Sequence, residues 1–311
     1  MSKREAKPGG RQLPESGVMP KLPKQFNSFP FYYASLQCQW IYWYTTVEAA
    51  EPYVKGTGLC VARFPVKNEK GEDEDRAVLV LNFQRYTSHY SNGLGTTNEV
   101  EFNLLVFPAN RVPGVPKMPL WEYLHGNDQT ETIGHLRLHV AADNKVAVEA
   151  GREVFGEPKF YGVFNYEVPS LNAPMSASIP PTQVQKWRIQ LVNPDDPDDF
   201  VYRLQSDFTG YQWTKTDSTP IPEFATGLGR TVSTRWTIVG LFDTAILLSA
   251  QAEGIKLEIG ANDFPMTKDM RALFTDLKPV AAQMFESPPA CIEPRGFYMD
   301  VMDQDHHDDS E

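Results

Sequence analysis

The sequence predicts a mainly β protein of the α+β class, in which an antiparallel β-barrel or cone-like sheet system carries a few helices. Two observations lead to this fold class. Apolar and polar residues alternate with period two through several stretches, as they do in strands with one buried face. The strand–helix alternation behind a glycine-rich turn that a doubly wound parallel sheet needs does not occur. An antiparallel sheet system that closes on itself fits this pattern better.

Strands are expected first where β-branched and aromatic residues dominate, at residues 31–46, 57–64, 77–88 and 99–107. Alternation then marks residues 135–140, 186–191, 200–205 and 255–259. In the first of these later stretches the polar residues are His135, Arg137 and His139. Because side chains alternate across a strand, these three are expected to share one solvated face.

Three helices are expected. In residues 267–278 the apolar residues recur at helical spacing, with Thr267 as the cap and a proline as the stop. A second helix covers residues 145–154 and is capped by Asn144. A short third helix is expected after Thr46.

The chain has 311 residues, enough for one large domain. Residues 1–29 are rich in Lys, Pro, Gly and Ser and predict a flexible N-terminal arm. Residues 301–311 hold five acidic residues and no Lys or Arg, and they lack apolar anchors from Asp303 on, which predicts a disordered acidic tail. Residues 30–300 are therefore expected to form a single domain.

The charge and apolar pattern exclude some partners. The net charge is −11 with no basic stripe, so no nucleic acid is expected as a partner. The longest nearly apolar run, residues 238–250, is too short to span a bilayer and contains Asp243, so no membrane is expected either. The N-terminus lacks the apolar core of a secretory signal, which favours a cytoplasmic location.

The cysteines predict neither disulfides nor a metal site. Cys38, Cys60 and Cys291 are odd in number, far apart and without a C-x-x-C pair. His135 and His139 lack a third ligand in the sequence, so no metal is expected there.

The most informative stretch is residues 143–159, DNKVAVEAGREVFGEPK. A capped helix leads through Gly151-Arg152-Glu153 to a turn that ends at Pro158, and Lys159 opens an aromatic segment. The order D-N, G-R-E and P-K at this spacing resembles the acetoacetate decarboxylase superfamily. In that family the first lysine after the proline forms a Schiff base with the substrate ketone, and the resemblance implies this role for Lys159.

Two further segments resemble the same family. Residues 93–99, GLGTTNE, resemble the glycine-rich segment that leads to an active-site glutamate, which implies that Glu99 is a general acid and base. Glu293-Pro294-Arg295 resembles the closing strand and is a weaker match. The resemblance covers roughly residues 30–300 and implies the acetoacetate decarboxylase-like fold and a homo-oligomer.

The implied function is that of a Schiff-base lyase acting on a ketone or 2-oxo acid. Decarboxylation, carbon–carbon cleavage, or aldol addition with dehydration would all proceed through an iminium of Lys159. No cofactor is expected, because the protonated imine is itself the electron sink. The alternative is a non-catalytic protein that binds a small molecule in the same barrel, with Lys159 unreactive.

The chain departs from the family's decarboxylases at two positions. The second lysine of those enzymes is replaced by Phe160, and their early-strand arginine has no counterpart; Tyr44 is the best match to its position. Desolvation by Phe155, Phe160 and Tyr161 is therefore expected to deprotonate Lys159 well below the pH typical of lysine. Acetoacetate is not expected to be a good substrate, because no cation holds its carboxylate.

Arg152 and Glu153 are expected to form a buried ion pair that holds the turn and aims Lys159. The expected substrate-binding residues are Tyr44, Arg152, Phe160 and Phe155.

Overall fold

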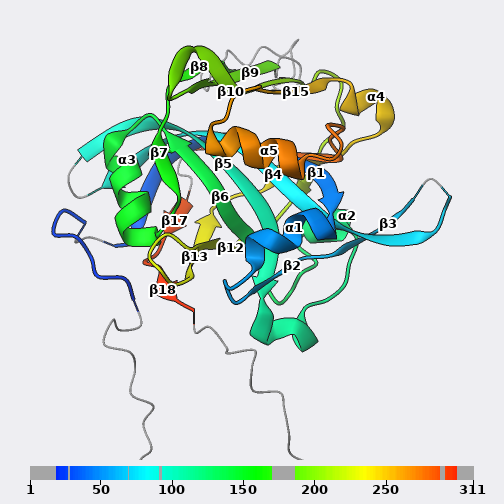
Figure 1. Cartoon of the computed structure of the whole chain (residues 1–311), viewed down its shortest axis with the longest axis horizontal. Coiled ribbons are helices and arrows are strands. Elements are labelled where there is room, and N and C mark those ends of the chain that lie inside the picture. Colours follow the sequence, from blue (N-terminus) through cyan, green and yellow to red (C-terminus); the bar gives the residue numbers. More distant parts are fainter. Residues whose placement is uncertain are drawn as a thin grey trace, which may run out of the picture.

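The computed structural model describes residues 19–26, 29–68, 70–90, 93–169, 186–287 and 291–299. Within this part of the chain, fourteen strands form one large sheet, and four form a small sheet above it (Figure 1). The large sheet comprises β1 (Phe31–Thr46), β2 (Leu59–Val61), β3 (Phe64–Lys67), β4 (Asp73–Tyr90), β5 (Gly93–Pro108), β6 (Gly134–Ala142), β7 (Lys159–Tyr161), β11 (Thr214–Thr216), β12 (Ile221–Ala225), β13 (Val232–Ile238), β14 (Phe242–Ile246), β16 (Ala281–Ser287), β17 (Cys291–Glu293) and β18 (Phe297–Tyr298).

The small sheet comprises β8 (Phe164–Glu167), β9 (Lys186–Asn193), β10 (Asp196–Asp207) and β15 (Ile255–Ile259). The α-helices are α1 (Val47–Val54), α2 (Leu120–Leu124), α3 (Lys145–Ala150), α4 (Ser249–Ala252) and α5 (Pro265–Leu273). A 3₁₀ segment, η1, covers Ala109–Gly114, and a π-helical turn, η2, covers Gly151–Phe155. The prediction of a mainly β fold with few helices is confirmed.

The central strands are buried on both faces. On β4, Leu79 and Leu81 face a core between the large sheet, the small sheet and α5. Val78 and Val80 face a second core, shared with α3 and with β13, β14 and β16. Double burial explains why residues 77–83 are almost continuously apolar instead of alternating.

The large sheet curls but is not a simple closed barrel. Strand β1 pairs with β4 on one side, and on the other with β17 at its start and β16 further along. Strand β17 also pairs with β13, which turns the sheet back toward β1. The sheet nevertheless continues from β16 through β14 to an edge at β11. The expected closed barrel or cone is therefore not confirmed.

The sheet is also not purely antiparallel. Strand β6 pairs in parallel with β7 and with β12. Between β6 and β7 the chain passes through α3 and η2, which is the helical crossover that a parallel pair requires. The sequence shows no glycine-rich turn here, so this single βαβ unit was not expected.

The expected helices are all present, with corrected ends. Thr46 caps α1 and Asn144 caps α3, each accepting a hydrogen bond from a backbone N–H of the first turn. Helix α5 begins at Pro265 and ends at Leu273, so Thr267 lies inside it and is not its cap. Proline at the first helical position explains the earlier start, since its fixed φ suits a helix N-terminus.

The predicted N-terminal arm, residues 1–29, is anchored over its described part. Phe26 is fully buried in the second core, and Arg295 donates a hydrogen bond to the carbonyl of Pro20 at 2.6 Å. Residues 19–26 and 29 therefore belong to the folded domain, contrary to the prediction. Residues 1–18 and the predicted acidic tail, residues 301–311, lie outside the described residues.

Cys38 is buried and Cys60 half-buried, and both are free thiols. Among the described helices, none is long and apolar enough to cross a membrane.

Candidate active site

Strands β5, β6 and β7 bring the two expected catalytic residues together. Lys159 opens β7, and the parallel pairing places it beside Val140 of β6. Glu101 of β5 lies opposite Val140 on the other side of β6, and Glu99 shares its strand face because side chains alternate. Lys159 and Glu99 therefore project toward the same space.

Lys159 is buried, with 6% of its side chain exposed, and its Nζ contacts two carboxylates. Oε2 of Glu99 lies 2.7 Å away and Oε2 of Glu157 lies 3.0 Å away. Tyr86 donates a hydrogen bond to the same oxygen of Glu99 at 2.7 Å, and Gln84 donates to Oε1 at 3.1 Å. The expected apolar wall around the ammonium is thus replaced by a polar, charged one.

The G-R-E motif shapes this site through its glycine and arginine. A Cβ atom at Gly151 would overlap the Glu157 carboxylate and the Lys159 side chain, so only glycine leaves room for both. Arg152 is exposed and donates from Nε to the carbonyl of Lys159, which fixes the start of β7. Glu153 is also exposed, so the expected buried pair with Arg152 is wrong.

A cavity of about 20 Å³ lies next to Lys159, which is room for a single water-sized group. It is lined by polar groups from β1, β4, β5, β6 and β17 together with aromatic and small residues: Tyr33, Gln84, Tyr86, Glu99, Arg137, Ala147, Ala150, Gly151, Phe155, Glu157, Lys159, Trp236 and Glu293. Of the expected substrate-binding residues, Phe155 lies in this wall.

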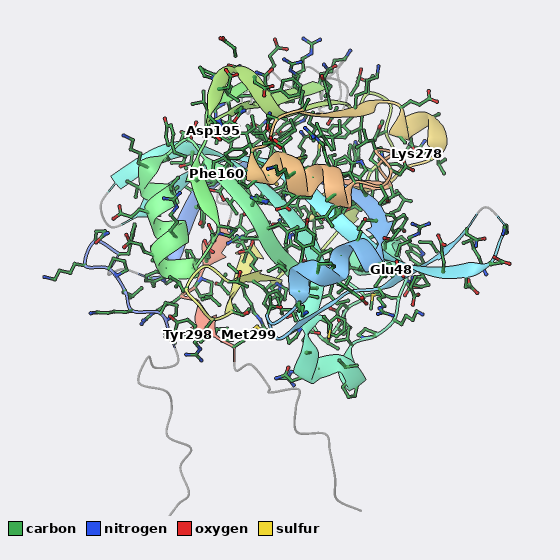
Figure 2. All side chains as sticks on the ribbon, viewed as in Figure 1. Glu48, Phe160, Asp195, Lys278, Tyr298 and Met299 are labelled. Carbon is green, nitrogen blue, oxygen red and sulfur yellow. The ribbon has the colours of Figure 1, made fainter. Side chains whose placement is uncertain are left out.

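The other expected substrate-binding residues lie elsewhere. Phe160 packs edge-on against Phe264, with ring centres 5.2 Å apart. It lies beside the start of α5 (Figure 2). Successive residues of a strand face opposite sides, so a neighbour of Lys159 in β7 cannot desolvate it. Tyr44 packs at the far end of β1, and it is Tyr33, near the start of that strand, that reaches the cavity.

Arg137 is the second cation of the site. Its guanidinium pairs with Glu101 at 3.1 Å, with Glu223 at 2.5 Å, and with Glu157 at short range. It is buried, so the solvated face predicted for His135, Arg137 and His139 is wrong.

A β-bulge at residue 138 separates the three polar residues of β6, because Arg137 and His139 oppose consecutive residues of β5. His139 therefore turns to the core between the large sheet, the small sheet and α5, where its Nε2 contacts Oδ2 of Asp269 at 2.6 Å. His135 is fully buried against Trp40, and burial with the neighbouring Arg137 lowers its pKa to about 3. Within the described part of the chain, no group of three or more ligand-type side chains is arranged to hold a metal.

The site carries more acidic than basic groups. Five buried glutamates surround the two cations Arg137 and Lys159, so the carboxyl groups outnumber the cations by three. The glutamates of this charged cluster are Glu99, Glu101, Glu157, Glu223 and Glu293. A buried carboxylate without a cation is unstable, so such groups take up protons.

The pKa directions follow this balance. Burial raises the pKa of Glu99, raises that of Glu223 strongly, and raises that of Glu293 to about 7. Burial also acts to raise the pKa of Glu157, but Arg137 and Lys159 outweigh it and the net shift is downward.

Several residues of the site were not expected from the sequence. Glu157 stands two positions before Lys159 inside the quoted motif, Glu101 shares a strand face with Glu99, and Glu293 opens the E-P-R segment. Each of these three glutamates therefore lies in or next to a sequence motif that the family resemblance had already identified. No motif points to Arg137 or Tyr33. The burial of Arg137 depends on the β-bulge in β6, and that of Tyr33 on the pairing of β1 with β17.

Comparison with known proteins shows a likeness in structure only. No family model matches the sequence, and no curated protein matches it. The enduracididine biosynthesis enzyme MppR with HEPES buffer bound superposes with a TM-score of 0.55 at 14% identity, over 96% of this chain and 97% of that one. The same enzyme complexed with pyruvate gives 0.53 at 14%, over 88% and 90%.

Two further solved structures agree. An acetoacetate decarboxylase-like enzyme from Sphingomonas wittichii RW1 gives a TM-score of 0.55 at 12% identity, over 88% of this chain and 94% of that one. Acetoacetate decarboxylase from Legionella pneumophila gives 0.53 at 12%, over 92% and 93%. The likeness spans nearly the whole of each chain, and the protein therefore has the acetoacetate decarboxylase-like fold.

Proposed function

We propose that this protein is a Schiff-base enzyme in which Lys159 condenses with a ketone or 2-oxo acid. The observation that carries the proposal is the buried Nζ of Lys159 at the cavity, 2.7 Å from Glu99. The amine attacks the carbonyl carbon, a carbon–nitrogen bond forms, and the carbonyl oxygen leaves as water. The protonated imine then accepts the electron pair of the bond that breaks.

Glu99 is suited to move the protons of this sequence. Only the free amine of Lys159 attacks a carbonyl, so the ammonium must first give up a proton. Burial raises the pKa of Glu99 and makes its carboxylate a better base for that proton. The same carboxyl then returns the proton to the departing hydroxyl. Tyr86 and Gln84 hold it in place from β4.

The structural neighbours support this class of chemistry and leave its type open. They include an acetoacetate decarboxylase and an enzyme solved with pyruvate. Decarboxylation, carbon–carbon cleavage, and aldol addition with dehydration all use the same iminium, which supplies the electron sink without a cofactor. Acetoacetate itself is expected to be decarboxylated slowly, because Arg137 already shares its guanidinium among three glutamates.

Reduction of the imine tests the proposal. The full chain is incubated with pyruvate, acetone or acetoacetate, reduced with sodium borohydride, and measured as the intact protein. One reduced imine per chain is expected, and peptide mapping should place it on Lys159. Lys159→Ala should lose the adduct, whereas Lys145→Ala, an exposed lysine in α3, should keep it.

Glu99→Gln separates the proposed role of Glu99 in proton transfer from the proposed role of Lys159 as the nucleophile. It should still form the adduct, with proton-transfer steps slowed by about 10²–10⁴-fold in a stopped-flow measurement. An adduct that maps only to other lysines contradicts the proposal. If no member of a broad carbonyl panel is trapped, the protein is better described as a binding protein with an unreactive Lys159.

A further inference from the structure

Two hydrogen-bond acceptors on the cavity wall have no donor. Oε1 of Glu293 and Oε1 of Gln84 are buried, and neither has a hydrogen-bond partner among the described residues. Glu293 is only 4% exposed, and on its other oxygen it accepts a hydrogen bond from Tyr33 at 2.6 Å. Buried acceptors without donors are costly in a folded protein, and two of them at one cavity indicate a ligand that donates.

The orientation of the Gln84 amide is fixed by its neighbours. Its Nε2 donates to Glu99 at 3.1 Å and lies 3.3 Å from Glu101. Both neighbours are carboxyl groups that accept hydrogen bonds, so the amide nitrogen must face them. The Gln84 oxygen is therefore a true acceptor at the cavity.

The charges of the wall favour the same kind of ligand. Glu99, Glu157 and Glu293 line the cavity, whereas Lys159 and Arg137 supply its positive charge. Arg137 is paired with three glutamates. Its Nε–H also has no acceptor among the described residues and is able to donate a hydrogen bond to an oxygen atom of the ligand. A carboxylate placed there would face a wall that already has excess carboxyl groups.

From this wall we infer that the carbonyl substrate carries a cationic N–H donor, such as a primary ammonium or guanidinium, which binds Glu293 and Gln84 while Lys159 condenses with the carbonyl. The cavity of about 20 Å³ holds only one water-sized group, so the side chains of its wall must move apart to admit such a substrate. This inference rests on the proposed function and narrows its substrate class. The cation favours the deprotonated form of Glu293, a carboxyl group whose pKa burial raises to about 7, and its N–H groups supply the donors that the two acceptor oxygens lack. The result is discrimination against 2-oxo acids and other anionic carbonyl compounds.

Three small ketones of matched length test the inference. 4-Aminobutan-2-one carries an ammonium, 4-hydroxybutan-2-one carries a neutral hydroxyl, and 4-oxopentanoate carries a carboxylate at the same end of the molecule. Each is titrated against the full chain, and the borohydride-trapped fraction gives the half-saturating concentration. The amine is expected to half-saturate at a concentration about tenfold or more below that of the hydroxyl compound, and 4-oxopentanoate is expected to bind worst.

A charge-neutral variant checks that Glu293 is the origin of the preference. Glu293→Gln should reduce the ratio of amine to hydroxyl affinity to about one, because the amide cannot balance a cation. Glu153→Gln removes an exposed carboxylate of η2 and should leave that ratio unchanged. A thermal melt of each variant shows whether it is folded.

The possible outcomes separate the inference from the proposed function. If the hydroxyl compound or 4-oxopentanoate is trapped on Lys159 as readily as the amine, the charge preference is wrong and the Schiff-base function stands. If none of the three is trapped on Lys159 but pyruvate or acetone is, the charge preference is overturned and the Schiff-base function stands. If no carbonyl compound is trapped there, both are overturned. The wild-type comparison decides this even if Glu293→Gln does not fold.

Discussion

Among single residues, Arg137 shows how strongly the candidate site depends on one buried charge. Its guanidinium contacts Glu101, Glu157 and Glu223, and Glu157 in turn contacts Nζ of Lys159. The arginine therefore fixes the carboxylate that lies on one side of the proposed nucleophile. Period-two alternation gave no reason to bury it, because a strand pattern does not reveal which of its two faces meets water.

Replacing Arg137 should destabilise the protein strongly. Arg137→Met leaves three buried carboxyl groups without their cation, and we expect a loss of about 3–5 kcal/mol in the free energy of unfolding. Urea denaturation at neutral pH measures it. Arg63→Met is the matched control, since Arg63 makes only an exposed ion pair with Glu51, and it should change stability by less than about 1 kcal/mol. A loss of that small size for Arg137→Met would contradict the ion-pair account.

At the scale of elements, the crossover from β6 to β7 determines where the nucleophile lies. Asn144 starts α3, the π-helical turn extends it, and Gly156 ends it with a left-handed φ of +69° that suits glycine. The N–H of Glu157 then donates to the carbonyl of Gly151 at 2.9 Å, which folds the Glu157 side chain back beside Lys159. The short distance between G-R-E and P-K in the sequence is thus a consequence of this tight return.

Filling the space at Gly151 should misplace the nucleophile more than it harms the fold. Gly151→Ala puts a methyl group against Glu157 and the Lys159 side chain, and both must move. We expect imine trapping to slow by about 10²-fold, since a displacement near 1 Å can have that effect. Gly114→Ala, where an added methyl group meets nothing within 4 Å, is the control and should trap normally. Equal trapping rates for the two variants would show that the Gly151 contact is unimportant.

For the whole molecule, an exposed apolar region at the small sheet suggests how subunits associate. Tyr161, Val163 and Tyr166, on β7, β8 and the link between them, are 48%, 52% and 38% exposed. Among the described strands, β8 lies at the end of the small sheet. An edge strand with apolar neighbours is a common site of pairing between subunits.

We expect the protein to be a homo-oligomer that associates through this edge. Light scattering at micromolar concentration should give a multiple of the 35.1 kDa chain mass. Val163→Glu should reduce that mass, because it places a charge in the interface. Val112→Glu, at an equally exposed valine of η1, should leave the assembly intact. A wild-type mass equal to one chain would refute the expectation.

Local chemistry in the sequence was sufficient for much of this description. Alternation and β-branched residues located eight of the eighteen described strands, and Thr46 and Asn144 identified the starts of two helices. Motif spacing led to Lys159 and Glu99, which lie 2.7 Å apart. These features depend on neighbours within a few residues, so the sequence records them directly.

Only the tertiary structure decided what surrounds those two residues. Glu293 from β17 and Arg137 from β6 reach one cavity because the large sheet curls, and no local pattern encodes that curl. The same geometry removed Tyr44 and Phe160 from the site, since each lies on a strand face or strand end that turns away from Lys159. Burial then raised the pKa of Glu99, Glu223 and Glu293, because a carboxyl group titrates according to its surroundings and not its position in the chain.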